Sequence, residues 1–153
     1  MPSRRDQITM SDEELRDFLE KHKTMQCATN GPRGVPHMVP LWYVPEGITT
    51  LRGWTFAKSQ KAKNLERDPR ATLGIEEGVE YQELRGVMFE CDVEVERDID
   101  RVAEHGLALV DRYAGGAEEA KAFFREQAKK RVGLTFRATR TVTWDHRKLG
   151  GTY

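Results

Sequence analysis

The 153-residue sequence has few of the features that identify several common protein classes. Its only two cysteines, Cys27 and Cys91, lie far apart and form no CxxC pair or metal-binding spacing. No apolar run approaches the roughly 20 residues that span a bilayer. The first ten residues are polar and charged, which is unlike a secretory signal peptide. We therefore expect a reducing, cytoplasmic setting and no membrane partner.

The chain also lacks net charge, because 25 Lys and Arg residues balance 25 Asp and Glu residues. No overall field draws it toward nucleic acid, so we expect no nucleic-acid partner. The length suits a single domain over residues 1–153, large enough for one core.

Common catalytic motifs are missing as well. The sequence contains no GxSxG, P-loop or GxGxxG pattern, which argues against hydrolase, kinase and dinucleotide-fold classes. Its histidines show no HxxxH or HxH spacing, so no metal site is expected. Cys91 lies in the apolar register of a predicted strand and is expected to be an inert core thiol. We name no catalytic residue.

What the sequence does contain is clear periodicity. Ser11 and Glu14 have the form of a capping box, which predicts that a helix begins at residue 12. Helices are predicted over residues 12–21, 60–66, 99–113 and 117–130. Strands are predicted over residues 24–29, 35–44, 49–56, 71–76, 84–96 and 131–143. These are about six mostly antiparallel strands with helices outside them, which favours a small barrel of the mainly β (α+β) class.

One predicted strand carries two prolines. Pro36 and Pro40 share a face with Met38 and Trp42 in the strand over residues 35–44. Proline cannot donate to a strand ladder, so this strand is expected at an edge, with a bulge, or facing something other than protein. A flat ligand is one candidate for that face.

A lysine-headed helix follows the strand over residues 49–56. Ser59 is its natural N-cap. Lys58, Lys61 and Lys63 crowd a helix end where the helix dipole already places positive charge. A bound phosphate would relieve this conflict, because free N–H groups, a hydroxyl and ammonium groups all bind it there. The alternative, that the lysines form a solvated face, stays open.

Trp144 is surrounded by charged residues in the C-terminal segment. Two interpretations are open for it. It covers a ligand or a partner subunit, or it ends the last strand by covering its own barrel.

Several segments together resemble the flavin and deazaflavin oxidoreductases related to pyridoxamine 5'-phosphate oxidase. They are the proline-bearing strand, SQKAKNLERDPR at residues 59–70, YQELRG at 81–86 and VTWDHRKLGGTY at 142–153. The resemblance covers nearly the whole chain from Asp12 and is nearest to bacterial proteins thought to use the deazaflavin coenzyme F-420. It implies an FMN-binding-like split β-barrel homodimer, with two cofactors in clefts between subunits.

The resemblance also implies a set of cofactor-binding residues. It assigns the phosphate to Lys58, Ser59 and Lys61, and the acidic polyglutamate tail of F-420 to Lys63. The remaining residues lie along the ring system or approach it from the C-terminal segment: Met38, Pro40, Trp42, Trp54, Thr55, Phe56, Trp144 and Arg147.

The implied activity is an F-420-dependent reductase that transfers hydride between the deazaflavin and an unsaturated small organic substrate. The chain departs from authentic pyridoxamine phosphate oxidases, because its ending TWDHRKLGG lacks their tryptophan–arginine–leucine–histidine pattern. Vitamin B6 chemistry is therefore not expected. Three alternatives stay open: an FMN-dependent oxidoreductase of the same fold, a non-catalytic carrier of a flavin or tetrapyrrole, and a structural protein that binds neither.

Overall fold

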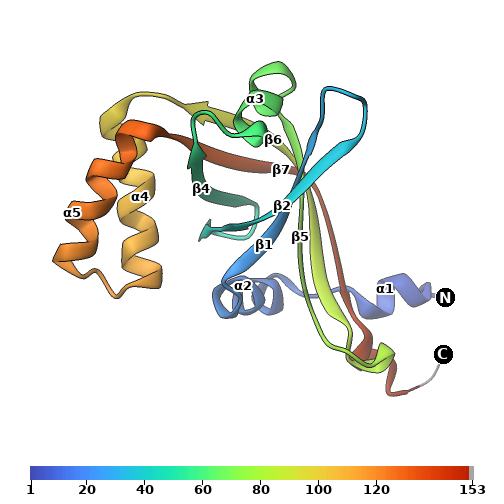
Figure 1. Ribbon diagram of the computed structural model, residues 1–153. Helices are drawn as coiled ribbons and strands as arrows, with labels where there is room; N and C mark the ends of the chain where they lie inside the picture. The colour runs from blue at the N-terminus through green and yellow to red at the C-terminus, as the bar shows by residue number, and fades with distance from the viewer. Residues whose placement is uncertain (152–153) are drawn as a thin grey trace.

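A single antiparallel sheet forms the centre of the computed structural model, which describes residues 1–151 (Figure 1). Its strands are β1 Thr24–Asn30, β2 Pro36–Trp42, β3 Val44–Glu46, β4 Thr50–Phe56, β5 Arg70–Glu77, β6 Arg85–Glu96 and β7 Arg131–Asp145. They are ordered β2-β1-β5-β6-β7-β4-β3, and every neighbouring pair is antiparallel. The sheet curls into a half-barrel, which confirms the predicted fold class.

The described part of the chain has seven strands where about six were expected, because the predicted strand over residues 35–44 divides at Tyr43. The Tyr43 side chain is fully buried, and its hydroxyl lies 2.7 Å from the carbonyl oxygen of Leu19. Before this residue, β2 pairs with β1; after it, β3 pairs with β4. The division lets one stretch of chain contribute to both edges of the sheet.

The two edges approach each other at Gly53. A Cβ atom at this position of β4 would lie 3.0 Å from the carbonyl oxygen of Trp42, at the end of β2. A larger residue would hold the two strands apart, so Gly53 permits the curl of the half-barrel.

Within residues 1–151, five α-helices lie around the sheet: α1 Arg4–Ile8, α2 Asp12–Lys21, α3 Gln60–Arg67, α4 Ile99–Tyr113 and α5 Glu118–Gln127. The predicted bounds of α2 and α4 are confirmed, and both hydrogen bonds of the Ser11–Glu14 capping box are present. The predicted helix over residues 117–130 continues past Gln127 only as a 3-10 turn. No prediction was made for α1, although Ser3 and Asp6 cap it by the same reciprocal pattern.

Figure 1 shows α3 at one end of the half-barrel, α2 at the other, and α4 with α5 as a pair beside β4 and β7. The guanidinium of Arg112, near the end of α4, donates to the carbonyl oxygens of Leu19 and His22 over 2.8 Å each. These carbonyls belong to the last turn and cap of α2, where helical partners are absent. Arg112 therefore joins the helical pair to α2.

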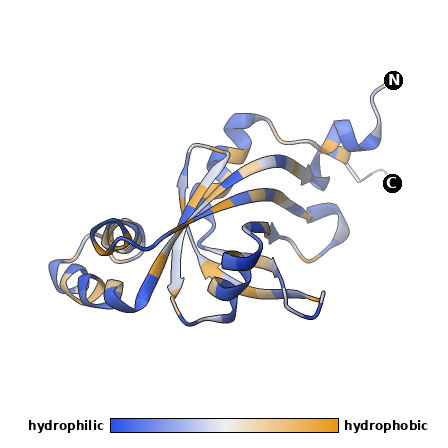
Figure 2. Ribbon diagram, turned by 90° about the horizontal axis from the view of Figure 1, so that it is seen from above, coloured by the Kyte–Doolittle hydropathy of each residue, from blue (hydrophilic) through white to orange (hydrophobic). Residues whose placement is uncertain are grey.

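Two apolar clusters hold the fold together. The larger one fills the half-barrel, and alternate residues of β6 contribute to it, as predicted: Val87, Phe89, Cys91 and Val93. Figure 2 shows the alternation of apolar and polar residues along the strands. The smaller cluster lies between β4 and the helical pair and contains Trp54, Val102, Leu109 and Ala128. Within the described residues, no helix is both long and apolar enough to cross a bilayer.

Candidate functional site

The first part of the candidate site is the N-terminus of α3. The Ser59 hydroxyl accepts a hydrogen bond from the backbone N–H of Ala62 over 3.1 Å, which confirms Ser59 as the N-cap. The Thr55 hydroxyl lies 3.3 Å from the Ser59 hydroxyl and supports it from the end of β4. Ser59 accepts from the helix, so its own O–H proton remains able to donate to an anion.

Lys61 is the unusual residue of this helix. Its side chain is only 5% exposed, whereas Lys58 and Lys63 are exposed. Among residues 1–151 no carboxylate lies within ion-pair distance of Lys61, and burial lowers the pKa of its ammonium group. The thiol of Cys27 is its electrostatic neighbour, but burial raises the pKa of that thiol to about 11, so the thiol is neutral at neutral pH. Lys61 is therefore a buried cation without a counter-charge, a costly arrangement unless an anion binds.

The helical period turns Lys61 inward. Lys61, Asn64 and Leu65 are spaced along one face of α3 and are all buried. The Asn64 amide donates to the hydroxyl of Thr29 in β1 over 3.0 Å, which fixes α3 against that strand. Thr29 pairs across the ladder with His37 of β2.

His37 adds a second unsatisfied group at this end of the half-barrel. Its Nδ1 atom is buried and has no hydrogen-bond partner among the described residues. A buried polar atom without a partner is uncommon in folded proteins and calls for an explanation. The unpaired ammonium of Lys61, the Ser59 hydroxyl and the first N–H groups of α3 form a donor set that fits a phosphate group.

The second part of the site is the outer face of β2. The structure confirms that this strand lies at a sheet edge, with Pro36, Met38, Pro40 and Trp42 all exposed. The side chains of Met38 and Trp42 are 64% and 49% exposed, which is high for large apolar residues. Trp42 stacks on Tyr113, with ring centroids 4.3 Å apart and planes 8° from parallel. The sheet therefore presents a flat apolar edge beside α4.

Trp54 lies on β4 but packs mainly within the protein. Its indole is 7% exposed, stacks on Phe124 at 5.2 Å and contacts Gly106 of α4. Together with Pro40 and Trp42 it lines a groove of about 340 Å³ next to α5. The sequence did not indicate that Trp54 would be held by the helical pair.

Trp144 packs on its own sheet. It pairs with Gly86 across β6 and β7, and a Cβ at Gly86 would lie 2.3 Å from the indole ring. The indole thus covers part of its own sheet, and the interpretation in which Trp144 covers a ligand or a partner subunit stays a prediction. With Met38, the indole also lines a hollow on the outer face of the sheet.

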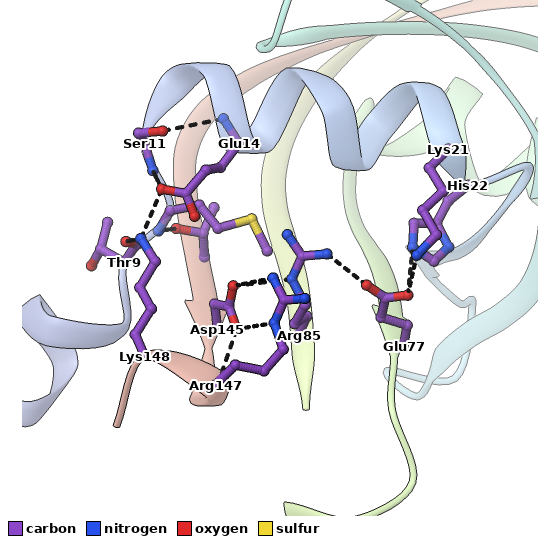
Figure 3. A network of polar contacts seen from close by, with 12 residues as sticks. Thr9, Ser11, Glu14, Lys21, His22, Glu77, Arg85, Asp145, Arg147 and Lys148 are labelled. Atoms are coloured by element: carbon purple, nitrogen blue, oxygen red, sulfur yellow. Dashed lines mark hydrogen bonds and ion pairs between the residues drawn. The ribbon is translucent and has the colours of Figure 1, made fainter. Parts of the chain in front are cut away.

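Arg147 is bound to Asp145 in the conformation observed (Figure 3). The Asp145 carboxylate is 2% exposed and accepts hydrogen bonds from Arg147 over 2.8 and 2.9 Å and from Arg85 over 3.1 Å. Hydrogen bonding from Arg147 holds the pKa of Asp145 below its ordinary value. Arg85 also reaches Glu77, which pairs with Lys21. A cofactor role for Arg147 stays a prediction.

The predicted residues therefore lie in five neighbourhoods. The phosphate candidates gather at α3 with Thr55 and Lys63; Pro40, Trp42 and Trp54 share the groove beside α5; Met38 and Trp144 share the outer hollow; Phe56 lies against Arg131; and Arg147 belongs to the Asp145 network. Sequence reasoning missed His37 and Arg131. Arg131 lies opposite Phe56 across β4 and β7, with its guanidinium 4.0 Å from the Phe56 ring.

Comparison with known proteins gives a consistent result. The sequence profile of the family described as pyridoxamine 5'-phosphate oxidase matches residues 11–145. The structure superimposes on a conserved hypothetical protein from Mycobacterium tuberculosis with a TM-score of 0.88 and 40% identity, covering 99% of this chain and 95% of that one. No curated protein matches the sequence significantly.

Two further solved structures share the architecture. An F-420 reductase superimposes with a TM-score of 0.65 and 25% identity, over 82% of this chain and 94% of that one. The heme storage protein HutZ from Vibrio cholerae gives a TM-score of 0.69 at 18% identity, over 86% and 94% of the two chains. At that identity the likeness to HutZ concerns the fold alone.

Proposed function

The chain belongs to the pyridoxamine 5'-phosphate oxidase family, and from this premise we propose that it is an oxidoreductase that binds the deazaflavin coenzyme F-420. The observation that carries the proposal is the buried, unpaired ammonium of Lys61 at the N-terminus of α3. Similarity to an F-420 reductase at 25% identity supports the choice of cofactor.

In this proposal Lys61 holds the cofactor phosphate by charge. Ser59 donates its hydroxyl proton, and the free N–H groups of the first turn of α3 complete the phosphate site. Lys58 lies beside this site and Lys63 is exposed on α3, where it can meet the acidic tail. Anion binding would remove the energetic cost of the buried Lys61 ammonium, so the site is built to be occupied.

The ring system is assigned to the exposed face of β2. Met38, Pro40 and Trp42 offer it a flat apolar wall, and the strand carrying Thr55 and Phe56 leads from this region to the phosphate site. When bound, the deazaflavin supplies hydride transfer to an electron-poor double bond of the substrate, and a solvent proton completes the reduction. The protein's task is then to bind and orient both molecules.

A homodimer is part of the proposal. The outer hollow brings the apolar side chains of Met38, Met88, Val142 and Trp144 together beside Arg5 and Arg140, and contiguous exposed apolar surface is a mark of interfaces. We assign this face to contact with a second copy of the chain, so that each cofactor lies between subunits. Arg147 would approach the cofactor from the C-terminal segment that follows β7.

The test is a fluorescence titration of the cofactor-stripped protein with F-420 and, in parallel, with FMN and heme. Each titration is repeated with Lys61→Ala and with Lys21→Ala, a control that removes an exposed lysine from α2. We expect F-420 to bind most tightly and Lys61→Ala to weaken it by about 1.5–3 kcal/mol, as loss of a charge-assisted hydrogen bond should. Lys21→Ala should leave the affinity unchanged.

The other outcomes separate the alternatives. Tighter binding of FMN would keep the phosphate site and overturn the F-420 assignment. Heme binding that does not depend on Lys61 would indicate a carrier and overturn both. If none of the three ligands binds, the oxidoreductase proposal fails.

A further inference from the structure

The groove beside α5 contains a cation that the proposed cofactor site does not use. Arg131 is the first residue of β7, and its guanidinium lies over the rings of Trp54, at 4.8 Å, and Phe56, at 4.0 Å. Its Nε atom is buried without a hydrogen-bond partner, and across residues 1–151 no carboxylate pairs with it. Burial lowers the pKa of this guanidinium. Arg131 thus resembles Lys61, because each is a cation that is at least partly shielded from solvent and has no anionic partner among the described residues.

The walls of the groove are aromatic. Trp42, 49% exposed, and Phe123 of α5, 60% exposed, both line it together with the buried Trp54. Exposed aromatic side chains gathered in one hollow favour a flat, conjugated guest. The volume of about 340 Å³ is at the lower end of the roughly 300–1,000 Å³ typical of small-molecule sites.

The groove adjoins both parts of the proposed cofactor site. Pro40 and Trp42 belong to the wall assigned to the ring system and also line the groove. The backbone N–H of Ala57, just before the α3 N-terminus, donates to the carbonyl oxygen of Lys130 over 2.9 Å, which places Arg131 near that turn. A ligand in the groove would therefore lie beside a ring system bound along β2.

We propose that this groove binds the substrate, and that the substrate is a planar conjugated carboxylic acid whose carboxylate pairs with Arg131 while its ring lies between Trp42 and Phe123. A guanidinium matches a carboxylate with two parallel hydrogen bonds, which fixes orientation as well as charge. The inference deepens the proposed function by naming its substrate class and rests on that function. Its binding test does not depend on turnover.

The experiment uses 2-naphthoate as the probe and 2-naphthamide as its neutral analogue. Each is titrated by calorimetry into the full chain, first without cofactor and then with saturating F-420. The variants are Arg131→Met, which keeps an apolar stem, Arg131→Lys, which keeps the charge, and Phe123→Ala, which removes one wall. Far-ultraviolet circular dichroism and thermal unfolding establish that each variant folds.

We expect naphthoate to bind at least about tenfold more tightly than naphthamide, and Arg131→Met to abolish this difference. Arg131→Lys should restore part of the difference, and Phe123→Ala should weaken both probes. In the titration without cofactor, Lys61→Met should leave naphthoate binding unchanged, because that lysine belongs to the phosphate site. The affinity for F-420 should be unaffected by Arg131→Met.

Several results would overturn the inference. Naphthoate binding that is lost in Lys61→Met but kept in Arg131→Met would mean that the acid occupies the phosphate site. Weakened F-420 binding in Arg131→Met would make Arg131 a cofactor residue. A protein that binds naphthoate through Arg131 but binds neither F-420 nor FMN would have a carboxylate site without a cofactor. That result would overturn the substrate assignment, and the missing cofactor binding would by itself overturn the proposed function. If naphthoate does not bind at all, the groove is not a carboxylate site.

Discussion

The guanidinium of Arg147 donates two hydrogen bonds to the carboxylate of Asp145, over 2.9 and 2.8 Å, and Asp145 stays almost fully buried beneath it. Arg85 donates a third bond from the neighbouring strand β6, over 3.1 Å. A buried carboxylate is tolerated because these donors replace its water. The arrangement ties the segment that follows β7 to the sheet and, through Glu77, to the end of α2.

Asp145→Asn should therefore destabilise the protein. It removes the negative charge between two guanidinium groups and leaves Arg85, whose side chain is 12% exposed, with only Glu77 as a partner. We expect the free energy of unfolding, measured by urea titration at neutral pH, to fall by about 2–3 kcal/mol. The control is Glu90→Gln, because Glu90 pairs with Arg140 on the exposed surface and should contribute less than about 1 kcal/mol. Equal effects for the two variants would contradict the prediction.

A second prediction concerns the contact between Gly86 and Trp144. A Cβ atom at Gly86 would lie 2.3 Å from the indole and 2.8 Å from the carbonyl oxygen of Ile75, which belongs to the backbone and cannot swing away. Gly86→Ala should lower the free energy of unfolding by about 1–3 kcal/mol, the usual cost of overpacking. Gly74→Ala, in the adjacent strand β5, is the matched control, because its Cβ would meet nothing within 4 Å. Equal losses of stability in Gly86→Ala and Gly74→Ala would contradict the prediction.

These contacts show which parts of the fold could be predicted from the sequence. The capping box of Ser11 and Glu14 and the N-cap Ser59 mark helix starts through local hydrogen bonds, so they are readable without knowing the fold. Pro36 and Pro40 likewise restrict β2 to an edge through their missing donors. The sheet order was not predictable in this way, because it depends on pairings between strands distant in sequence.

The residues of the candidate site also divide into those that the sequence indicates and those that only the structure reveals. The positive cluster at α3 was visible in the sequence, but only the structure separates the buried Lys61 from the exposed Lys58 and Lys63. The sequence does not indicate a binding role for Arg131, because a lone arginine at the start of a strand has no local pattern that would suggest one. Its significance comes from Trp54 and Phe56, two residues of a strand about 75 positions earlier, because its guanidinium lies over both of their rings.

A third prediction is that the buried His105 makes stability depend on pH. Its Nδ1 lies 3.0 Å from the carbonyl oxygen of Gly53, its ring packs against Gly133, and burial lowers its pKa to about 4. In the unfolded chain the pKa of this histidine is about 6.5. Between that pH and about 4, the unfolded state therefore binds a proton that the folded state does not bind. Stability should therefore fall as pH drops from about 6.5 to 4, by up to about 3 kcal/mol, with no contribution from His105 above that window.

The variant His105→Asn isolates this effect, because the Asn amide can donate to the Gly53 carbonyl but does not titrate. The free energy of unfolding is measured by urea titration at several pH values between about 4.5 and 7.5. These values cover most of the window between the two pKa values and extend above it. We expect the variant to lose less stability than the wild type on acidification, even if its stability at neutral pH is lower. Parallel pH profiles for the two proteins would show that His105 is not the group responsible.

The last prediction concerns Lys61, and it has two parts of opposite sign. Because burial lowers the pKa of its ammonium group, the charged form costs stability at every pH below its unfolded pKa of about 10.4. Lys61→Met keeps a similar apolar stem and removes the charge, so in phosphate-free buffer the variant should be more stable than the wild type by about 1 kcal/mol or more. Inorganic phosphate at matched ionic strength should raise the melting temperature of the wild type, since a ligand that binds the folded state alone stabilises it, and should not raise that of the variant. Lys21→Met, which removes an exposed lysine, should change neither quantity appreciably. A Lys61→Met protein that is less stable without phosphate would mean that the ammonium group is satisfied within the chain, and the case for an anion site at α3 would then lose its main support.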